Sequence, residues 1–328
     1  MAKANTYDAV GNREDLTDII KMVDIEKYPV SSIIPDGSKP LGTYHEWQTD
    51  YIGDVDTTGV IEGTDQSVFN DQSENRARLG NYVMQLREPW SVSREQEVVT
   101  TAGVPSEIAR SKARAAQKMK RKLEVQICGD DDRNAGSSST ARVSRGLGDW
   151  IDSAGPSDVD SSVRTPSGSI DATATASLTE ALFNGVLQSV YEVGGNSNLI
   201  DIGGPAHINA VATFTRVQST AKYAAYHVNQ DATSHRMDFK VDIYQGPFSI
   251  IKVMPTVYNG RTSGAAATDV SKARAYVLDP ELLSINYLIK PGSEEFEDQG
   301  GGRRGMNSMH YALTCKNPKG LGKFNPTS

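Results

Sequence analysis

The stretch "VPSEIARSKARAAQKMKRKLEVQICGD", residues 104–130, carries the strongest structural signal in this 328-residue sequence. Pro105 stands near the first turn of a predicted helix, and Gly129 follows its last periodic residue. These are the positions that the two residue types prefer at helix ends. At 1.5 Å per residue, a helix over residues 106–128 is about 35 Å long. The sequence therefore predicts one long helix between Pro105 and Gly129.

This helix has an apolar side and a basic side. With 100° between successive residues, one arc collects the apolar residues Ile108, Ala116, Met119, Leu123 and Ile127. The opposite side is a basic face made of Arg110, Arg114, Lys118, Arg121 and Lys122. Lys112 falls within the apolar arc and is expected to extend its ammonium group away from it. Like charges four residues apart oppose the helix by about 0.2–0.5 kcal/mol per pair, so something must offset this repulsion.

The chain as a whole is acidic. It has 41 acidic and 34 basic residues and a net charge of -7, which argues against a protein that coats nucleic acid over its whole surface. Its 38% hydrophobic content is that of an ordinary soluble globular protein. We expect no membrane partner, because no stretch approaches the roughly 18–20 apolar residues of a membrane span. Cys128 and Cys315 form no CxxC pair and are expected to be reduced thiols of a protein made in a cytoplasm.

A short helix and a hairpin are predicted before the long helix. Asn12 precedes a short amphipathic helix that Pro29 and Pro35 are expected to end. Residues 43–52 and the stretch beginning at Asn81 alternate in the manner of strands, and would form a long hairpin whose arms each reach roughly 30 Å. An isolated two-stranded ribbon is marginally stable. The hairpin therefore needs a partner surface, in its own chain or in another.

The segments after the long helix mix helices and strands. Residues 130–176 are predicted as loops around an apolar island near Trp150. Ser177 and Glu180 form a capping box for a helix; its predicted apolar stripe is Leu178, Leu182, Val186 and Val190. A second helix is predicted over residues 205–214, and strands over residues 199–204, 241–255, 273–279 and 309–317. The fold class is α+β without internal repeats.

The sequence contains no motif for catalysis, a cofactor or a metal ion. Gly300, Gly302 and Gly305 match the letters GxGxxG, but an acidic segment precedes them instead of an apolar strand and no helix pattern follows, so no dinucleotide site is predicted. The five histidines lack the spacing of a metal site. The acidic run at residues 130–132 lacks the ligand pattern of an EF-hand loop and is interpreted as a solvated turn. We expect a protein that is not an enzyme.

Several stretches, taken in order, resemble the major capsid proteins of tailed bacteriophages, in particular the SU10-type family with the HK97 fold. The resemblance begins with "NREDLTDII" (12–20), "TYHEWQTD" (43–50), the long helix and "SLTEALFNGVLQSVYEVGGN" (177–196). It continues through "VDIYQGPFSIIKVMP" (241–255) and "YVLDPELLSINYL" (276–288) to "YALTCKNPKGLGKF" (311–324). It implies a structural subunit that assembles into the hexamers and pentamers of an icosahedral head enclosing double-stranded DNA.

The resemblance also implies a division of the chain. An N-terminal arm (1–39) precedes an extended hairpin called the E-loop (40–97), a peripheral domain with the spine helix (98–150), an axial domain (151–290) and return strands of the peripheral domain (291–328). In this fold the hairpin lies over a neighbouring subunit. The residues expected to contact that neighbour are Tyr44, Trp47, Asp54, Asp56, Glu62, Asp65, Asp71, Glu74 and Tyr82.

Two departures from related proteins bear on the partners. No lysine occurs between Pro40 and Ile108, so the lysine crosslink of some members should be absent, and noncovalent contacts alone or a cement protein would hold the shell. The arm begins almost at Met1, so scaffolding is expected from a separate protein. A portal and packaged DNA, bound without sequence specificity, complete the expected partners of a virion capsid assembled in the host bacterial cytoplasm.

Three interpretations of the basic face stay open. Water and salt can offset its repulsion, the acidic hairpin tip of a neighbour can pair with it, or packaged DNA can bind it through phosphates. Other functions also stay open: an encapsulin-like compartment shell, a cytoplasmic nucleic-acid-binding protein that uses the basic helix, and an unrecognised hydrolase.

Overall fold

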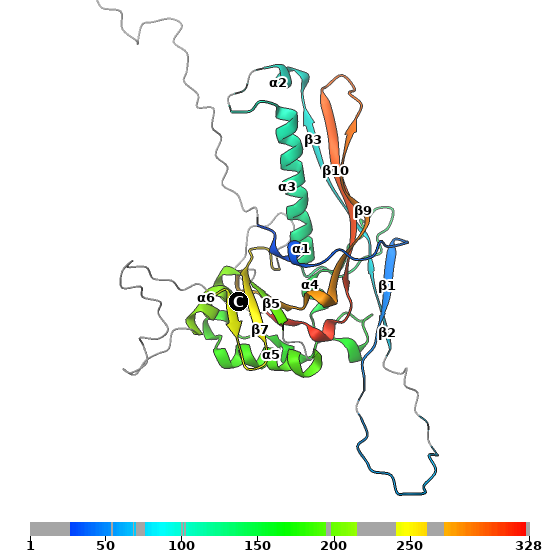
Figure 1. Cartoon of the computed structure of the whole chain (residues 1–328). Helices are drawn as coiled ribbons and strands as arrows, with labels where there is room; N and C mark the ends of the chain where they lie inside the picture. The colour runs from blue at the N-terminus through cyan, green and yellow to red at the C-terminus, as the bar shows by residue number, and fades with distance from the viewer. Residues whose placement is uncertain are drawn as a thin grey trace, which may run out of the picture. The chain divides into compact units, whose positions relative to one another are not determined.

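The computed structural model describes residues 27–53, 55–67, 69, 76–99, 101, 103–194, 198–214, 241–260 and 272–325 (Figure 1). The chain divides into two compact units. The first includes Arg87–Met119 and Gly292–Ser308, and the second consists of Lys27–Leu86, Lys120–Pro291 and Met309–Ser328. The elements with residues in both units are α3 (Glu107–Ile127), β3 (Met84–Val92), β9 (Leu283–Phe296) and β10 (Arg303–Cys315).

The first unit is built around a three-stranded sheet with the order β3-β10-β9, and α2 (Arg94–Val98) follows β3. Trp90 on β3 is buried, and a Cβ atom at Gly305 would lie 2.5 Å from its ring. Only glycine therefore lets the indole lie against β10. Gly300 and Gly302 have φ angles of 97° and 119° in the turn between β9 and β10. A turn and a close approach thus account for the three glycines that match GxGxxG.

The predicted long helix is confirmed as α3. Lys112 pairs with Glu295, and its Nζ atom lies 5.2 Å from the centre of the Trp90 ring, so the ammonium group extends past the apolar arc as expected. One residue of the predicted arc was wrong, because Ala116 is exposed. The buried row steps by four residues instead, and consists of Ala115, Met119, Leu123 and Ile127.

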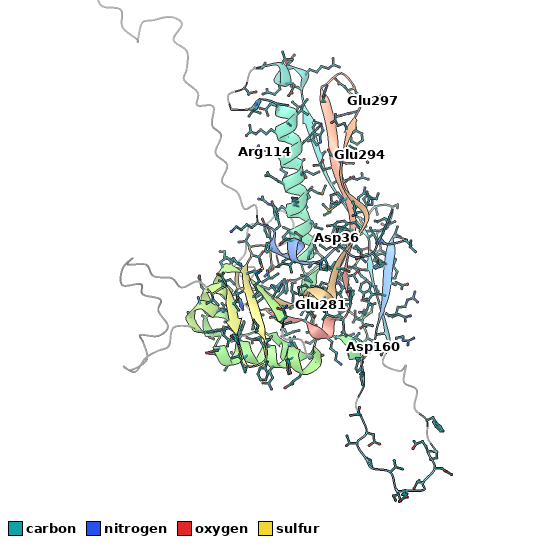
Figure 2. All side chains as sticks on the ribbon, in the orientation of Figure 1. Asp36, Arg114, Asp160, Glu281, Glu294 and Glu297 are labelled. Atoms are coloured by element: carbon teal, nitrogen blue, oxygen red, sulfur yellow. The ribbon has the colours of Figure 1, made fainter. Side chains whose placement is uncertain are left out.

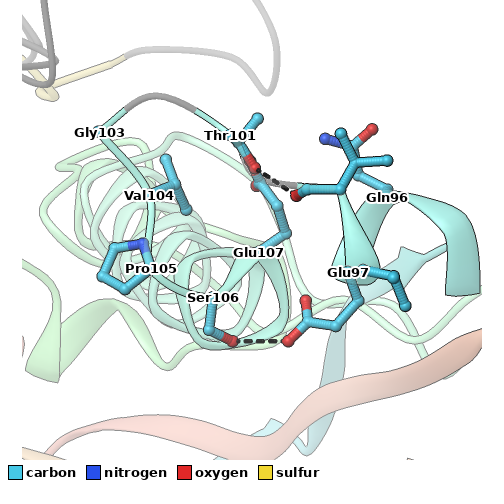
Figure 3. A pocket seen from close by; sticks show the side chains of 10 residues that line it. Gln96, Glu97, Thr101, Gly103, Val104, Pro105, Ser106 and Glu107 are labelled. Carbon is cyan, nitrogen blue, oxygen red and sulfur yellow. Dashed lines mark hydrogen bonds between the residues drawn. The ribbon is translucent and has the colours of Figure 1, made fainter.

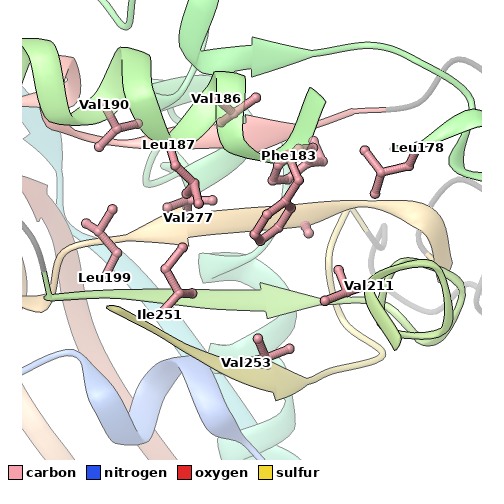
Figure 4. Packing of buried hydrophobic residues seen from close by; sticks show 12 residues of the cluster. Leu178, Phe183, Val186, Leu187, Val190, Leu199, Val211, Ile251, Val253 and Val277 are labelled. Carbon is pink, nitrogen blue, oxygen red and sulfur yellow. The ribbon is translucent and has the colours of Figure 1, made fainter. Parts of the chain in front are cut away.

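The second unit contains a six-stranded mixed sheet. Its strand order is β4 (Ile170–Asp171), β11 (Gly322–Phe324), β8 (Ala275–Leu278), β5 (Asn198–Gly203), β7 (Ile250–Pro255) and β6 (Ile243–Gln245). The helices α5 (Glu180–Gly194) and α6 (Pro205–Phe214) contribute to one core on this sheet (Figure 4). Phe183 of α5 stacks on Phe324 of β11 with 5.4 Å between ring centres. The core therefore joins segments that are far apart in the sequence.

The start and the stripe predicted for α5 need correction. Thr179, not Ser177, caps the helix, because its Oγ1 atom accepts the N–H of Leu182 at 3.3 Å, while Ser177 ends a 3-10 turn. Leu182 is 40% exposed and does not belong to the buried stripe. The buried residues of α5 follow the i, i+3, i+4, i+7 spacing and are Phe183, Val186, Leu187 and Val190.

The hairpin is shorter than the sequence predicted. β1 (Tyr44–Thr49) pairs antiparallel with β2 (Ala77–Tyr82), from Tyr44 opposite Tyr82 to Thr49 opposite Ala77. The second arm therefore begins at Ala77 and not at Asn81, and it stops before Val83, whose N–H donates to Thr43 O at 2.8 Å. Most of the stretch predicted as this arm, residues 81–93, is instead β3, which lies beside β10 in another sheet. Six residue pairs span about 20 Å. Residues 50–53, 55–67 and 69 form no strand.

Pro29 begins a helix that the sequence did not predict. The helix predicted after Asn12 lies outside the described residues, and α1 (Pro29–Ile33) has proline at its first position, where a missing N–H costs no hydrogen bond. The next two N–H groups, of Val30 and Ser31, each donate to the carboxylate of buried Glu124 on α3 at 2.8 Å. The apolar island also forms a helix, α4 (Leu147–Trp150), with both terminal side chains buried.

Candidate assembly surfaces

The base of the hairpin is fixed by a buried side chain at the end of β2. Asn81 Nδ2 donates to Leu313 O at 2.7 Å and to Ser144 Oγ at 3.0 Å. Its Oδ1 atom accepts the N–H groups of Arg145 and Tyr82, both at 2.9 Å. One amide therefore ties β2 to β10 and to the loop before α4.

The aromatic residues predicted to contact a neighbouring subunit make contacts within the chain. Tyr44 and Tyr82 lie opposite each other with 4.6 Å between ring centres, and Arg133 covers both rings and donates to the Tyr44 hydroxyl. Trp47 Nε1 donates to Cys315 O at 2.8 Å, and its ring lies 5.7 Å from that of Trp150. These residues hold the hairpin base, and an intersubunit role for them stays a prediction.

A buried guanidinium group gathers aspartates beside the hairpin base. Arg145 is fully buried, and its Nη2 atom lies 2.6 Å from Asp132 and 2.7 Å from Asp158. Its guanidinium group also lies 4.7 Å above the ring of Trp150. Arg133 joins the cluster with its Nη2 atom 2.8 Å from Asp158. Burial alone would raise the pKa of Asp158, but the hydrogen bonds and charge of Arg145 hold it below its usual value.

One member of this cluster lacks a hydrogen-bond donor. Asp149 Oδ2 lies 2.8 Å from Arg145 Nε, but that N–H donates to Asp132 at 3.1 Å. Among the described residues, none donates a hydrogen bond to this buried oxygen. Burial, partly offset by the charge of Arg145, raises the pKa of Asp149 to about 6. Asp149 is therefore still mostly ionised at pH 7, but it takes up a proton at a higher pH than a free aspartate does.

The acidic residues 130–132 follow the turn that ends α3 and are exposed, in agreement with the predicted solvated position at the helix end. They also have partners within the chain. Asp130 pairs with Arg274, and Asp132 pairs with Arg145. Asp131 accepts a hydrogen bond from Gln126 Nε2 at 2.6 Å. The arginine partners were not predicted because they come from other positions in the sequence, where no local pattern indicates them.

The tip of the hairpin differs from its base. The predicted contact residues Asp56, Glu62 and Asp65 are exposed, whereas Asp54, Asp71 and Glu74 lie outside the described residues. Between these acids the chain exposes large apolar side chains, each with 72–92% of its surface accessible: Ile52, Val55, Val60, Ile61 and Phe69. The tip thus combines acidic groups with uncovered apolar surface.

Part of the basic face of α3 has partners within the chain. Lys118 Nζ lies 3.3 Å from the largely buried carboxylate of Glu88 on β3. Arg121 lies beside the Tyr258 hydroxyl, where it partly offsets the effect of burial, which raises the pKa of that tyrosine. Arg114 (Figure 2) and Lys122 are exposed and also interact within the chain, and Arg110 is half-buried. Sequence reasoning missed these internal partners because Glu88 and Tyr258 are distant in sequence.

A shallow pocket lies at the N-terminus of α3 in the first unit (Figure 3). Glu97 of α2 accepts the hydroxyl hydrogen of Ser106 at 3.0 Å and the N–H of Ile108 at 3.3 Å. Val98 and Val99 at its rim are strongly exposed. The carboxylate of Glu97 is thus already engaged in capping the helix.

A second pocket follows the edge of β9. Gly37 N–H donates to Ile285 O at 2.9 Å, and Ile285 N–H donates to Pro35 O at 3.0 Å, which forms a parallel bridge between Asp36 and Ile285. Beyond the bridge the two segments separate around a cavity of ≈ 450 Å³, lined by Asp36, Gly37, Lys39, Tyr287, Leu288, Ile289 and Lys290. β9 is the edge strand of its sheet, and no other described strand pairs with this edge after Ile285.

Neither a metal site nor a membrane span is found in the part of the chain that the structure describes. Its His, Cys, Asp and Glu side chains form no group that could hold a metal ion. None of its helices has the length and apolar character required to cross a bilayer. Cys128 and Cys315 are fully buried free thiols whose pKa values burial raises.

Comparison with known proteins gives one family and a set of similar structures. The family model described as SU10 major capsid protein matches residues 3–328, whereas no curated protein sequence matches the chain. The asymmetric unit of the bacteriophage PhiM1 mature capsid is similar with a TM-score of 0.64 and 10% identity, over 99% of this chain and 97% of that one.

Two other solved capsids show the same likeness. The capsid of cyanophage P-SCSP1u has a TM-score of 0.60 at 9% identity, over 96% of this chain and 93% of that one. The capsid of the native GTA particle has a TM-score of 0.58 at 12% identity, over 98% of this chain and 97% of that one. At such low identity these likenesses show the fold alone.

Proposed function

Because this chain belongs to the SU10 major capsid protein family, we propose that it assembles into the hexamers and pentamers of an icosahedral phage head that encloses double-stranded DNA. As a family member it is a structural capsid protein and not an enzyme, and it shares its α+β fold with phage capsid proteins. In this proposal it has the HK97 architecture. The hairpin of β1 and β2 is the E-loop, α3 is the spine helix of the peripheral domain, and residues 151–290 form the axial domain.

The exposed hairpin tip is the observation that carries the proposal. Full burial of a Val, Ile or Phe side chain is worth about 1.5–3 kcal/mol relative to leaving it in water. The tip leaves five such side chains exposed between residues 52 and 69. Large exposed apolar side chains gathered in one segment indicate an interaction site. A neighbouring subunit would cover these side chains, and the acids Asp56, Glu62 and Asp65 would set its position through charge.

The other partners follow from the same role. With no lysine between Pro40 and Ile108, the shell is held by noncovalent contacts alone or with a separate cement protein. A scaffolding protein and a portal are supplied by other chains, and assembly takes place in the host bacterial cytoplasm. Packaged DNA is bound without sequence preference through its phosphates.

Variants of the basic face of α3 distinguish two possible partners of this face, the acidic tip of a neighbouring subunit and packaged DNA. If the acidic tip of a neighbour binds it, the double variant Arg114→Glu and Lys118→Glu should lose assembly, and Asp56→Lys with Asp65→Lys should partly restore it. If DNA binds it, the same double variant should form empty shells normally and lose only filled particles. Normal assembly and normal DNA retention would leave water and salt as the partners of this face.

The proposed function is tested by making the tip polar. The double variant Ile61→Asp and Phe69→Asp, co-expressed with the neighbouring genes, should yield unassembled subunits, because carboxylates replace apolar groups that a neighbour would bury. Negative-stain micrographs and sedimentation measure the yield of closed shells.

The matched control places the same charge on the same tip without removing apolar surface. Thr64→Asp with Ser67→Asp adds two carboxylates at exposed positions and should leave most of the shell yield intact. Closed shells of uniform diameter from the Ile61→Asp and Phe69→Asp variant, at the yield of the unchanged protein, would overturn the role of the tip in assembly. Absence of closed shells from the unchanged protein under the same conditions would overturn the proposed function.

A further inference from the structure

The outer edge of β9 offers unpaired main-chain groups at the bottom of the pocket. Both the N–H and the C=O of Ile285 point outward, toward residues 35–37. Main-chain groups alternate in direction along a strand, so those of Tyr287 and Ile289 point to the same outer side. No other described strand pairs with them. A free strand edge of this kind can accept a strand from another chain.

The open part of this edge has defined limits. On one side it begins after the bridge between Asp36 and Ile285. On the other side it ends at Pro291, the next residue with the same orientation as Ile289, because proline has no N–H to donate. Lys39 and Lys290 line the pocket, with Asp36 as its only acidic lining residue. The edge therefore fits a short extended segment that carries negative charge.

The hairpin tip contains a segment with these properties. Residues 55–62, "VDTTGVIE", include five β-branched residues, which favour a strand. The structure places no strand in this segment. Its apolar side chains Val55, Val60 and Ile61 are strongly exposed. It carries two acids, Asp56 and Glu62, and no basic residue.

We propose that residues 55–62 of one subunit add as a strand to the edge of β9 at Tyr287–Ile289 of a second copy of this chain. This inference rests on the proposed function, in which the tip contacts a neighbour, and it names the place of contact. Hydrogen bonds to the outward N–H and C=O groups of Tyr287 and Ile289 hold the segment. Lys39 and Lys290 attract its two carboxylates, and exposed Ile289 packs against its β-branched side chains.

Cysteine crosslinking in assembled shells tests the contact. The native thiols Cys128 and Cys315 are fully buried, so only the introduced cysteines are expected to form disulfide bonds. Ile289→Cys is combined in turn with Thr58→Cys, Val60→Cys and Glu62→Cys, because one position of the tip should come opposite Ile289 for a given register. The comparison variant combines Val60→Cys with Lys118→Cys on the basic face of α3.

The expected result is loss of the monomer band on non-reducing gels in favour of multimers, for at least one tip position combined with Ile289→Cys. An internal disulfide would keep the monomer mass and is thus distinguished. Multimers from the Lys118→Cys comparison variant but from none of the Ile289→Cys combinations would overturn this inference and leave the proposed function intact. Absence of both, together with normal shells from the Ile61→Asp and Phe69→Asp variant, would overturn any contact of the tip with a neighbour, whereas only absence of closed shells from the unchanged protein would overturn the proposed function.

Proline substitutions, which remove main-chain N–H donors, test the hydrogen bonds between the added strand and β9. Ile289→Pro removes the outward N–H on an edge that already tolerates Pro291, and it should abolish closed shells, whereas Ile289→Thr keeps the N–H and should assemble. Val60→Pro removes a donor from the incoming segment at a position outside any strand, so it tests the same hydrogen bonds even if Ile289→Pro fails to fold. Normal shell yield from Val60→Pro and from a folded Ile289→Pro would contradict the strand addition.

Discussion

The base and the tip of the hairpin formed by β1 and β2 are held in opposite ways. At the base, Asn81 satisfies its amide with partners on β10 and on the loop before α4, and Arg133 bridges Tyr44 and Asp158. At the tip, Ile61 and its apolar neighbours are exposed and the described residues form no strand. Contacts within the chain therefore hold the base of the hairpin, whereas the apolar side chains of the tip are available for contact with another subunit.

This difference implies that the base of the hairpin contributes to folding of the subunit and that the tip contributes to assembly. Removing a partner from a buried polar group leaves the other partner unsatisfied, and that penalty falls on the folded subunit. Removing an exposed apolar side chain costs the folded subunit almost nothing. Substitutions at the base should therefore change the stability of the unassembled subunit, and substitutions at the tip should change only the yield of shells.

The largest effect on stability is expected at Arg145. Arg145→Met leaves the carboxylates of Asp149 and Asp158 without their main cation, which should lower the free energy of unfolding by about 3 kcal/mol. Denaturant unfolding of the unassembled subunit measures this change. Arg142→Met, at an exposed position of the same loop, serves as control and should stay within about 0.5 kcal/mol. Equal effects of the two changes would mean that the Arg145 cluster does not hold the base.

A smaller loss is expected at Asn81. Asn81→Leu keeps the size of the side chain but leaves Leu313 O and the N–H of Arg145 unsatisfied, which should cost about 2–3 kcal/mol. Gln48→Leu, on an exposed position of the paired strand β1, is the control and should change stability by less than about 0.5 kcal/mol. A loss below that size at Asn81 would show that water replaces these hydrogen bonds.

Local patterns in the sequence predicted the helices and strands better than they predicted the contacts between them. The periodicity of residues 106–128 and the alternation around residues 43–52 indicated α3 and β1, because side-chain spacing within one segment suffices for that. β9 was not predicted as a strand: its first residues, Leu283–Asn286, are all buried, and residues 292–296 are polar and exposed, so neither part shows alternation. The ends of α5 and β2 shifted by two to four residues because capping and pairing decide them.

The hairpin base could not be predicted, because its partners meet only in the folded chain. Arg145 lies in a stretch that reads as loop, and Asp132 and Asp158 are each 13 positions away from it. Tyr44 and Trp47 were assigned to a neighbour because their strand alternates without a clear buried face, whereas Arg133 and Trp150 contact them within the chain. The acids of the tip could be identified because they lie close together in the sequence, whereas its exposed apolar side chains were not predicted.

A pH effect of about 1 kcal/mol is expected from Asp149. Its pKa is about 6 in the folded chain against 3.8 for the free side chain, so protonation favours the folded state, and stability should rise as pH falls through 6. Between pH 7.5 and pH 5 the gain should be about 1 kcal/mol. Asp149→Asn should be the more stable protein at pH 7.5 and should lack this gain. Parallel pH profiles for the two proteins would contradict the raised pKa.

The smallest effect is expected where one substitution is made at both ends of the hairpin. Val60→Thr at the tip, where the side chain is 72% exposed, should change the stability of the unassembled subunit by less than about 0.5 kcal/mol. Val83→Thr at the base, where it is 4% exposed, buries a hydroxyl group and should cost about 1–2 kcal/mol. Unfolding curves of both variants make the comparison, and each subunit is then tested for shell yield. If Val60→Thr destabilised the subunit as much as Val83→Thr, the tip would pack on its own chain. Its exposed apolar surface would then no longer call for a neighbouring subunit, which is the observation on which the proposed function depends.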